Sequence, residues 1–445
     1  MTTLTATEKP SFGEALRFWW KLGWISFGGT AAHLGIMHEE LVENKKWIGN
    51  GVFLHALSHC MLLPGPEAQE LAIYIGHRLH GIRGGLVAGT LFVLPSTIVL
   101  LAFSIVYVRF GTVPLIASSF NGLKPVVLAL LLLALRRVSA RALRRPLQWI
   151  VAACTFVGMF FLSLPVTSIL LGAIVLGVAV MAVRPSLVRT QDDEGEAIDD
   201  EPAGIANGHS PKRGSAPLAW RFLKLTAVAL VLWLLPLPYL YFYGIDFPYW
   251  KTAALFFTKT AFVTVGGSYT VIPYVAQIAV TKFHWLSSAQ MTDGFALAET
   301  TPGPLIIVLA FVGFMAAYNH FQHSLWMGTL GLLLTTFYTF LPPFWFVFAG
   351  APVMERTHSA PAIKGVLALI TAVVVGAMLD LLLFIAKGVL FPSNASGIQD
   401  MDLLTAASAL VALVLLARFK LGVGYGILLG IVSGALRYAF GLRVG

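Results

Sequence analysis

Long apolar segments separated by short polar loops dominate this chain of 445 residues. A helix needs about 20 residues to cross the hydrocarbon core of a membrane, and several of the segments reach that length. They are residues 86–107, 149–183, 218–235, 327–350, 366–385 and 403–417. The segment 149–183 has room for two short spans that meet at Pro165. The pattern predicts an all-α integral membrane protein with many spans.

Composition and charge narrow the class of protein. Hydrophobic residues make up 57% of the chain, charged residues make up 11%, and the mean hydropathy is +0.80. A soluble domain carries roughly 25% charged residues, so the expected surroundings are the lipid bilayer. The net charge of +9 comes from Lys and Arg residues scattered between spans, which argues against a nucleic-acid partner. Cys60 and Cys154 lie in apolar segments, and we expect neither a disulfide nor a metal site from them.

The chain repeats itself after a shift of 238 positions. A repeat at constant register indicates two related structural units. The matching residues of the first half are Phe18, Lys21, Gly28, Gly29, Val42, Trp47, Pro64, Gly65, Pro66 and Ala72. They fall on Phe256, Lys259, Gly266, Gly267, Val280, Trp285, Pro302, Gly303, Pro304 and Ala310 without a gap. We therefore predict two homologous halves.

The repeat divides the chain into six parts. These are a first repeat (14–138), two spanning helices (149–183), a linker (184–217), a spanning helix (218–243), a second repeat (252–386) and a C-terminal helical hairpin (403–440). The linker is rich in Pro, Gly, Ser and charged residues, including the acidic runs at 192–194 and 199–201. Such a segment buries too little to fold, so we expect a disordered cytoplasmic tether.

Basic residues predict the orientation in the membrane, because cytoplasmic loops carry an excess of Lys and Arg. The arginines of residues 136–145 and the basic residues around the linker place both regions in the cytoplasm. The loop 77–83 carries Arg78 and Arg83, whereas its counterpart 319–324 carries no Lys or Arg. This asymmetry is typical of inverted repeats. Four spans per half, three between the halves and two at the end give about thirteen, with the C-terminus outside.

Each half contains the same two helix-breaking motifs, Gly-Gly and Pro-Gly-Pro. Proline and glycine together interrupt a helix, and unpaired backbone at membrane depth is tolerated where it lines a cavity or meets protein. A helix that restarts after a break directs free N–H groups at an anion. The candidate substrate-binding residues are Gly28, Gly29, Pro64, Gly65, Pro66, Gly266, Gly267, Thr300, Thr301, Pro302, Gly303 and Pro304. The alternative is that each motif is only a packed kink or a close helix crossing.

Ionisable residues within the membrane are costly and often functional. Glu67 follows the first Pro-Gly-Pro and Glu299 precedes the second. Both are candidates for proton coupling, and the alternative is that they bond freed backbone at the breaks. Further coupling candidates are His38, Glu40 and Asp380.

Two aligned lysines and several histidines are further candidates for binding an anion or a metal ion. Lys21 and Lys259 each precede a Gly-Gly pair by two helical turns. They either attract an anion or extend to the membrane interface. His55 and His59 are spaced as neighbours on a helix, but no acidic residue completes a metal site. The chain also has no phosphate-binding loop and no clustered catalytic residues. We expect a transporter with no cofactor, and not an enzyme.

Several segments resemble a known family. They are Phe27-Gly28-Gly29, His38 to Val42, Cys60 to Gln69, Gly84-Gly85-Leu86, Phe92 to Ser96, Ala298 to Ile306 and Gly350-Ala351-Pro352. The sequence resembles the chromate ion transporter family in its long, two-domain form. It departs from the family pattern at Thr30, His33, Ser58 and His59.

The resemblance implies a function and a location. A member of this family exports chromate across the bacterial cytoplasmic membrane and so gives chromate resistance. Chromate is a tetrahedral dianion similar to sulfate, and sulfate or another oxyanion is the alternative substrate. A homodimer is compatible with the sequence.

Overall fold

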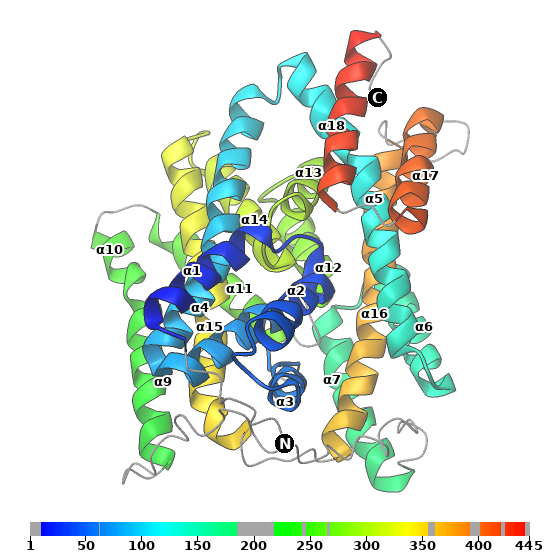
Figure 1. The fold of residues 1–445 in the computed structure, drawn as a ribbon. Helices are drawn as coiled ribbons and strands as arrows, with labels where there is room; N and C mark the ends of the chain where they lie inside the picture. Colours follow the sequence, from blue (N-terminus) through cyan, green and yellow to red (C-terminus); the bar gives the residue numbers. More distant parts are fainter. Residues whose placement is uncertain are drawn as a thin grey trace.

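The computed structural model of the protein describes residues 10–61, 63–184, 218–242, 246–264, 268–354, 361–391, 401–419 and 423–440. All regular structure in these ranges is helical, which confirms the predicted all-α class. Long helices form an upright bundle, and short helices cross or fill its centre (Figure 1). The expected disordered linker, after Arg184, lies outside the described residues, as do Gly266 and Gly267.

The first repeat begins with short helices and ends with long ones. The short elements are α1 (Phe12–Ile25), α2 (Gly29–His38), the π-helix η1 (Glu39–Asn44) and α3 (Asn50–Cys60). The long elements are α4 (Glu67–Phe110) and α5 (Pro114–Ala142). The Ser11 hydroxyl accepts a bond from the Glu14 amide and so begins α1.

The second repeat has the same order of elements. Its short elements are α11 (Phe247–Val263), η3 (Ser268–Thr270), α12 (Val271–Gln277), the π-helix η4 (Ile278–Lys282) and α13 (Ser288–Glu299). They are followed by η5 (Leu305–Ile307), α14 (Val308–His320), α15 (Leu325–Met354) and α16 (Pro361–Leu390).

The backbone repeats at the shift found in the sequence. The Trp47 amide donates to the Leu41 carbonyl at 2.8 Å, and the Trp285 amide donates to the Ala279 carbonyl at 2.9 Å. A π-helix precedes each tryptophan. The residue just before each tryptophan, Lys46 or His284, has φ 51°. These unusual features occur 238 residues apart, so the two halves share a backbone conformation as well as residue types.

Each half also contains a helical hairpin held by glycines. In the first half, α4 turns back on itself near Gly81 (φ 64°). A Cβ on Gly76 would lie 2.5 Å from the Gly84 carbonyl oxygen. In the second half, α14 and α15 form the hairpin, and a Cβ on Gly331 would lie 2.3 Å from the Gly313 carbonyl oxygen. Small residues allow this close backbone approach.

Six helices in the described ranges are long and apolar enough to cross a membrane. By contrast, α1, α2 and α3 have 14, 10 and 11 residues. At 1.5 Å per residue such helices span about 15–21 Å, which is less than the roughly 30 Å of the hydrocarbon core. The first part of each repeat is therefore built from partial spans. The number thirteen is not confirmed and stays a prediction.

The remaining helices pack around the two repeats. They are α6 (Pro146–Phe160), α7 (Val166–Val183), α9 (Leu218–Leu234), α10 (Pro236–Phe242), α17 (Leu403–Arg418) and α18 (Val423–Ala439). Helices α6 and α7 pack on α16, and α9 packs on α15. The break between α6 and α7 ends at Pro165, the N-cap of α7. The segment therefore contains two helices, and that both cross the membrane stays a prediction.

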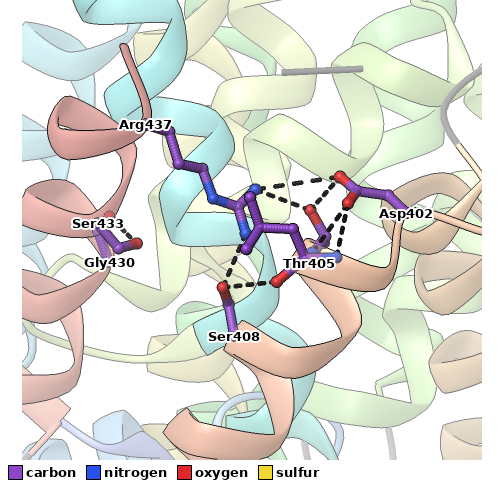
Figure 2. Close-up of polar contacts among 7 residues, drawn as sticks. Asp402, Thr405, Ser408, Gly430, Ser433 and Arg437 are labelled. Atoms are coloured by element: carbon purple, nitrogen blue, oxygen red, sulfur yellow. Dashed lines mark hydrogen bonds and ion pairs between the residues drawn. The ribbon is translucent and has the colours of Figure 1, made fainter. Parts of the chain in front are cut away.

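A buried arginine joins the last two helices, which both pack on α5. Arg437 of α18 donates to the hydroxyls of Thr405 and Ser408 on α17 at 2.9 and 2.7 Å (Figure 2). Its guanidinium also lies 4.0 Å from the carboxylate of Asp402, which caps the start of α17. A buried charge requires such partners, so this cluster joins α17 to α18.

Candidate functional site at the two helix breaks

Both Pro-Gly-Pro motifs interrupt a helix. The first lies between the end of α3 at Cys60 and the start of α4 at Glu67. The second lies between the end of α13 at Glu299 and the start of η5. Gly65 has φ 149° and Gly303 has φ 92°, a region that favours glycine. The motifs are therefore true breaks with non-helical backbone.

The two breaks are bonded to each other's half of the molecule. The Gly65 amide donates to the Thr264 carbonyl at 2.7 Å, and the Gly303 amide donates to the Ser26 carbonyl at 2.6 Å. Ser26 and Thr264 are equivalent under the shift of 238, as are the two glycines. Each carbonyl follows α1 or α11 and stands just before a Gly-Gly pair. The contact is thus reciprocal, as a two-fold relation between the halves requires.

The first Gly-Gly pair lies against the second half. Gly28 has φ 97° and Gly29 has φ 76°. A Cβ on Gly29 would lie 3.2 Å from the hydroxyl oxygen of Tyr269, on η3. The second pair, Gly266 and Gly267, lies outside the described residues.

The glycines of the breaks are tightly enclosed. A Cβ on Gly65 would lie 2.5 Å from an oxygen of the Glu70 carboxyl and 3.1 Å from Pro343 of α15. A Cβ on Gly303 would lie 2.7 Å from the Ser96 hydroxyl oxygen on α4. Each break therefore packs against the long hairpin of the opposite half.

Three acidic residues surround the breaks. Glu67 is the first residue of α4 and Glu299 is the last residue of α13, and each is 8% exposed. Glu70 is fully buried and packs on Gly65. Glu70 did not enter the sequence prediction, although its position one helical turn after Glu67 was a signal that it shares the same site.

Thr300 and Thr301 are buried beside the second break. Their hydroxyls donate at 2.7 Å to the carbonyls of Leu297 and Ala298. These bonds satisfy backbone acceptors at the end of α13, a need common to helix C-termini. Both hydroxyl protons are therefore used by the backbone, and both hydroxyl oxygens keep acceptor capacity. A role in substrate binding stays a prediction.

The aligned lysines lie on exposed faces of α1 and α11, and a role in attracting the substrate stays a prediction. Lys21 and Lys259 are exposed, and the buried faces of their helices are formed by other residues, such as Phe18 and Leu22 on α1. This placement fits lysines that extend from the helix to the membrane interface. Arg137 on α5 is exposed as well, and its charge acts on the Tyr269 hydroxyl, as does that of Glu299. The position of Arg137 among the cytoplasmic arginines of residues 136–145 gave no sign of this interaction.

The other coupling candidates lie away from this centre. His38 is bonded to Asn50 at 2.8 Å and lies 3.2 Å from the Glu43 carboxylate. Glu40 is partly buried in η1, and Asp380 is partly buried in α16. No group of three His, Cys, Asp or Glu side chains among the described residues is placed to hold a metal ion.

A second polar contact also joins the halves. Lys124 of α5 lies 2.8 Å from one oxygen of Asp293 on α13, and the Tyr107 hydroxyl donates to the other oxygen at 2.8 Å. Asp293 and Tyr107 line a cavity of about 420 Å³, together with Asn121, Gln290, Tyr318 and Asn319 among others. The sequence pattern gave no signal for this cluster, because its members are distant along the chain.

Comparison with known proteins bears on what this centre does. The protein-family model described as chromate transporter matches residues 13–178 and 251–436 of this chain. The chromate transport protein of Cupriavidus metallidurans is 28% identical over 408 residues, which cover 92% of this chain and 88% of that protein. The chromate transport protein of Pseudomonas aeruginosa is 28% identical over 78% of this chain and 74% of its own. The probable chromate transport protein of Synechococcus elongatus is 26% identical, covering 83% and 84%. No solved structure matches the chain.

Proposed function

Because the chain belongs to the chromate transporter family, we propose that it exports chromate from the cytoplasm by alternating access around the two Pro-Gly-Pro breaks. Export across the bacterial cytoplasmic membrane would give chromate resistance. The observation that carries the mechanism is the reciprocal bonding of Gly65 to Thr264 and of Gly303 to Ser26. A contact that repeats under exchange of the halves allows two conformations in which the halves exchange roles.

The proposed exchange requires the repeats to be inverted, so that their two-fold axis lies in the membrane plane. The reciprocal contact supports a two-fold axis, and loop charge supports its direction. Arg78 and Arg83 flank the hairpin turn of α4, whereas the turn after α14 has no Lys or Arg. Equivalent turns are expected to differ in their number of Lys and Arg residues when one turn is cytoplasmic and the other is not.

The dianion would bind where the helices restart. The Gly65 and Gly303 amides are already bonded to carbonyls of the opposite half in this conformation, so they hold the halves together. The next free donors are the first-turn amides of α4, at Glu67 and Ala68, and of η5, at Leu305. Helix N-termini favour anions. Arg137 supplies a positive charge that acts on the Tyr269 hydroxyl.

Sulfate is the alternative substrate, because it has the same shape and charge as chromate and would use the same donors.

The acidic residues beside the breaks also affect the binding of a dianion. Glu67 and Glu299 repel a dianion when ionised, so we propose that they are neutral when substrate is bound. They would stay neutral throughout the cycle and so carry no proton across the membrane.

Transport into inverted membrane vesicles tests the proposal. Labelled chromate should enter in preference to sulfate, and a pH gradient should change the rate. Arg137→Gln should raise the substrate concentration for half-maximal rate, because it removes the positive charge that acts on the Tyr269 hydroxyl. Lys21→Met and Lys259→Met are matched controls that should change it little. Accumulation of sulfate and not of chromate would show that sulfate is the substrate. Absence of both fluxes would overturn the transport mechanism.

A further inference from the structure

Glu70 is an isolated carboxyl group at the centre of the molecule. Its side chain has 0% exposure, and neither carboxyl oxygen has a hydrogen-bond partner. The neighbouring Gln69 side chain is equally buried and unpartnered. Buried polar groups are normally bonded, so two adjacent unpaired side chains next to a helix break require an explanation.

The surroundings of Glu70 do not stabilise a negative charge. The titratable groups that interact with it are Glu67, one turn earlier on α4, and the Cys60 thiol at the end of α3, which the Glu70 charge affects in turn. Both groups are acidic and neither carries a positive charge. An ionised carboxylate without a partner in a dry site costs several kcal/mol or more. A neutral, protonated Glu70 avoids this cost in the described conformation.

The carboxyl is also in contact with the part of the molecule that must move. One Glu70 oxygen packs on Gly65, whose amide is bonded to Thr264 of the opposite half, and Pro343 of α15 packs on the same glycine. Opening of the Gly65–Thr264 contact would move Gly65, which lies against the carboxyl. Water that enters there could accept the Glu70 proton.

We propose that Glu70 is the proton-carrying group of the transport cycle, neutral while the Gly65–Thr264 contact is closed and ionised when that contact opens. This inference rests on the proposed transport function. It assigns one proton per cycle to a single carboxyl, taken up from one side of the membrane and released on the other. The neighbouring Gln69 side chain is then the polar group that can interact with the ionised Glu70 carboxylate.

The test uses the full chain in liposomes, with flux of chromate and movement of protons measured together. Glu70→Gln has the shape of the neutral carboxyl and cannot ionise. It should exchange chromate across the membrane at equal concentrations, as the wild type does, but should move no protons. Its rate should be flat with pH, whereas the wild-type rate should change by up to about tenfold per pH unit for one coupled proton. Glu43→Gln, on the exposed η1, is the matched control and should behave as wild type.

The outcomes separate this inference from the proposed function. A wild type that moves neither chromate nor sulfate defeats the transport proposal itself. Chromate flux in the wild type without proton movement defeats only the role of Glu70. So does a Glu70→Gln protein that keeps proton movement, or one that is folded and inactive in exchange, because the residue would then serve binding or structure. Proton movement lost in Glu67→Gln and kept in Glu70→Gln would transfer the role to Glu67.

Discussion

Glycine is required at positions 65 and 303 for two separate reasons. The backbone has positive φ at both, which costs another residue about 1–3 kcal/mol. In addition, a Cβ would meet the Glu70 carboxyl at Gly65 and the Ser96 hydroxyl at Gly303. The two causes can be separated at Gly303, because Ser96 can be shortened.

We predict that Gly303→Ala destabilises the protein and that Ser96→Gly partly rescues it. The second change removes the atoms 2.7 and 3.1 Å from the new Cβ, and leaves only the backbone strain of about 1–3 kcal/mol. Thermal unfolding in detergent should show a partial recovery of the melting temperature. Ser96→Gly should not rescue Gly65→Ala, whose Cβ meets Glu70 and Pro343. Equal rescue of both glycine variants would contradict the packing explanation.

Elements of the two halves meet at the breaks and at the contact of α4 and α5 with α13. In the second contact Lys124 and Asp293 are 19% and 13% exposed, so each depends on the other for charge compensation. Removal of one partner from a buried pair is more costly than removal of both. The contact therefore holds α5 to α13 most firmly when both charges are present.

We predict that Asp293→Asn destabilises the protein by roughly 2 kcal/mol, because Lys124 is left as a shielded, unpaired cation. Asparagine can still accept the bond from Tyr107, so the loss reports the ion pair. The double variant Lys124→Met with Asp293→Asn should recover much of the stability. Denaturation in detergent compares the three proteins with wild type. A double variant that is less stable than both single variants would show that the pair does not act as a unit.

The whole molecule consists of two similar halves that differ in what surrounds them. Helices α6 and α7 pack on the second half through α16, and α17 and α18 pack on the first through α5. The orientation of the halves in the membrane can be tested at the connection between α7 and α9 and at the chain after α18. Loop charge predicts that these two regions lie on opposite sides.

Reporter fusions test this orientation. A reporter inserted near Gly208, in the linker, should be active only in the cytoplasm, and one placed after Arg443 should be active only outside. Both positions lie outside the described residues, so the prediction rests on the distribution of Lys and Arg. A cytoplasmic C-terminus would give an even number of crossings. It would remove the charge argument for inversion without affecting the contacts at the breaks.

The sequence by itself determined the membrane class, the two halves and the positions of the breaks. Apolar segments identify spans because the bilayer imposes a length. Gly and Pro identify breaks because their effect on the backbone is local. The repeat at 238 residues survives in the fold because each half keeps the same short-range constraints, down to the left-handed residues Lys46 and His284.

The tertiary structure alone decided which groups meet at the centre. The bonds from Gly65 to Thr264 and from Gly303 to Ser26 join positions about 200 to 280 residues apart, and no local pattern encodes such a contact. The aligned Lys21 and Lys259 are exposed, whereas Glu70 is buried against Gly65 at the first break. Whether a polar side chain is isolated or exposed depends on the packing of helices from both halves. The chemistry of the site is therefore a property of their interface.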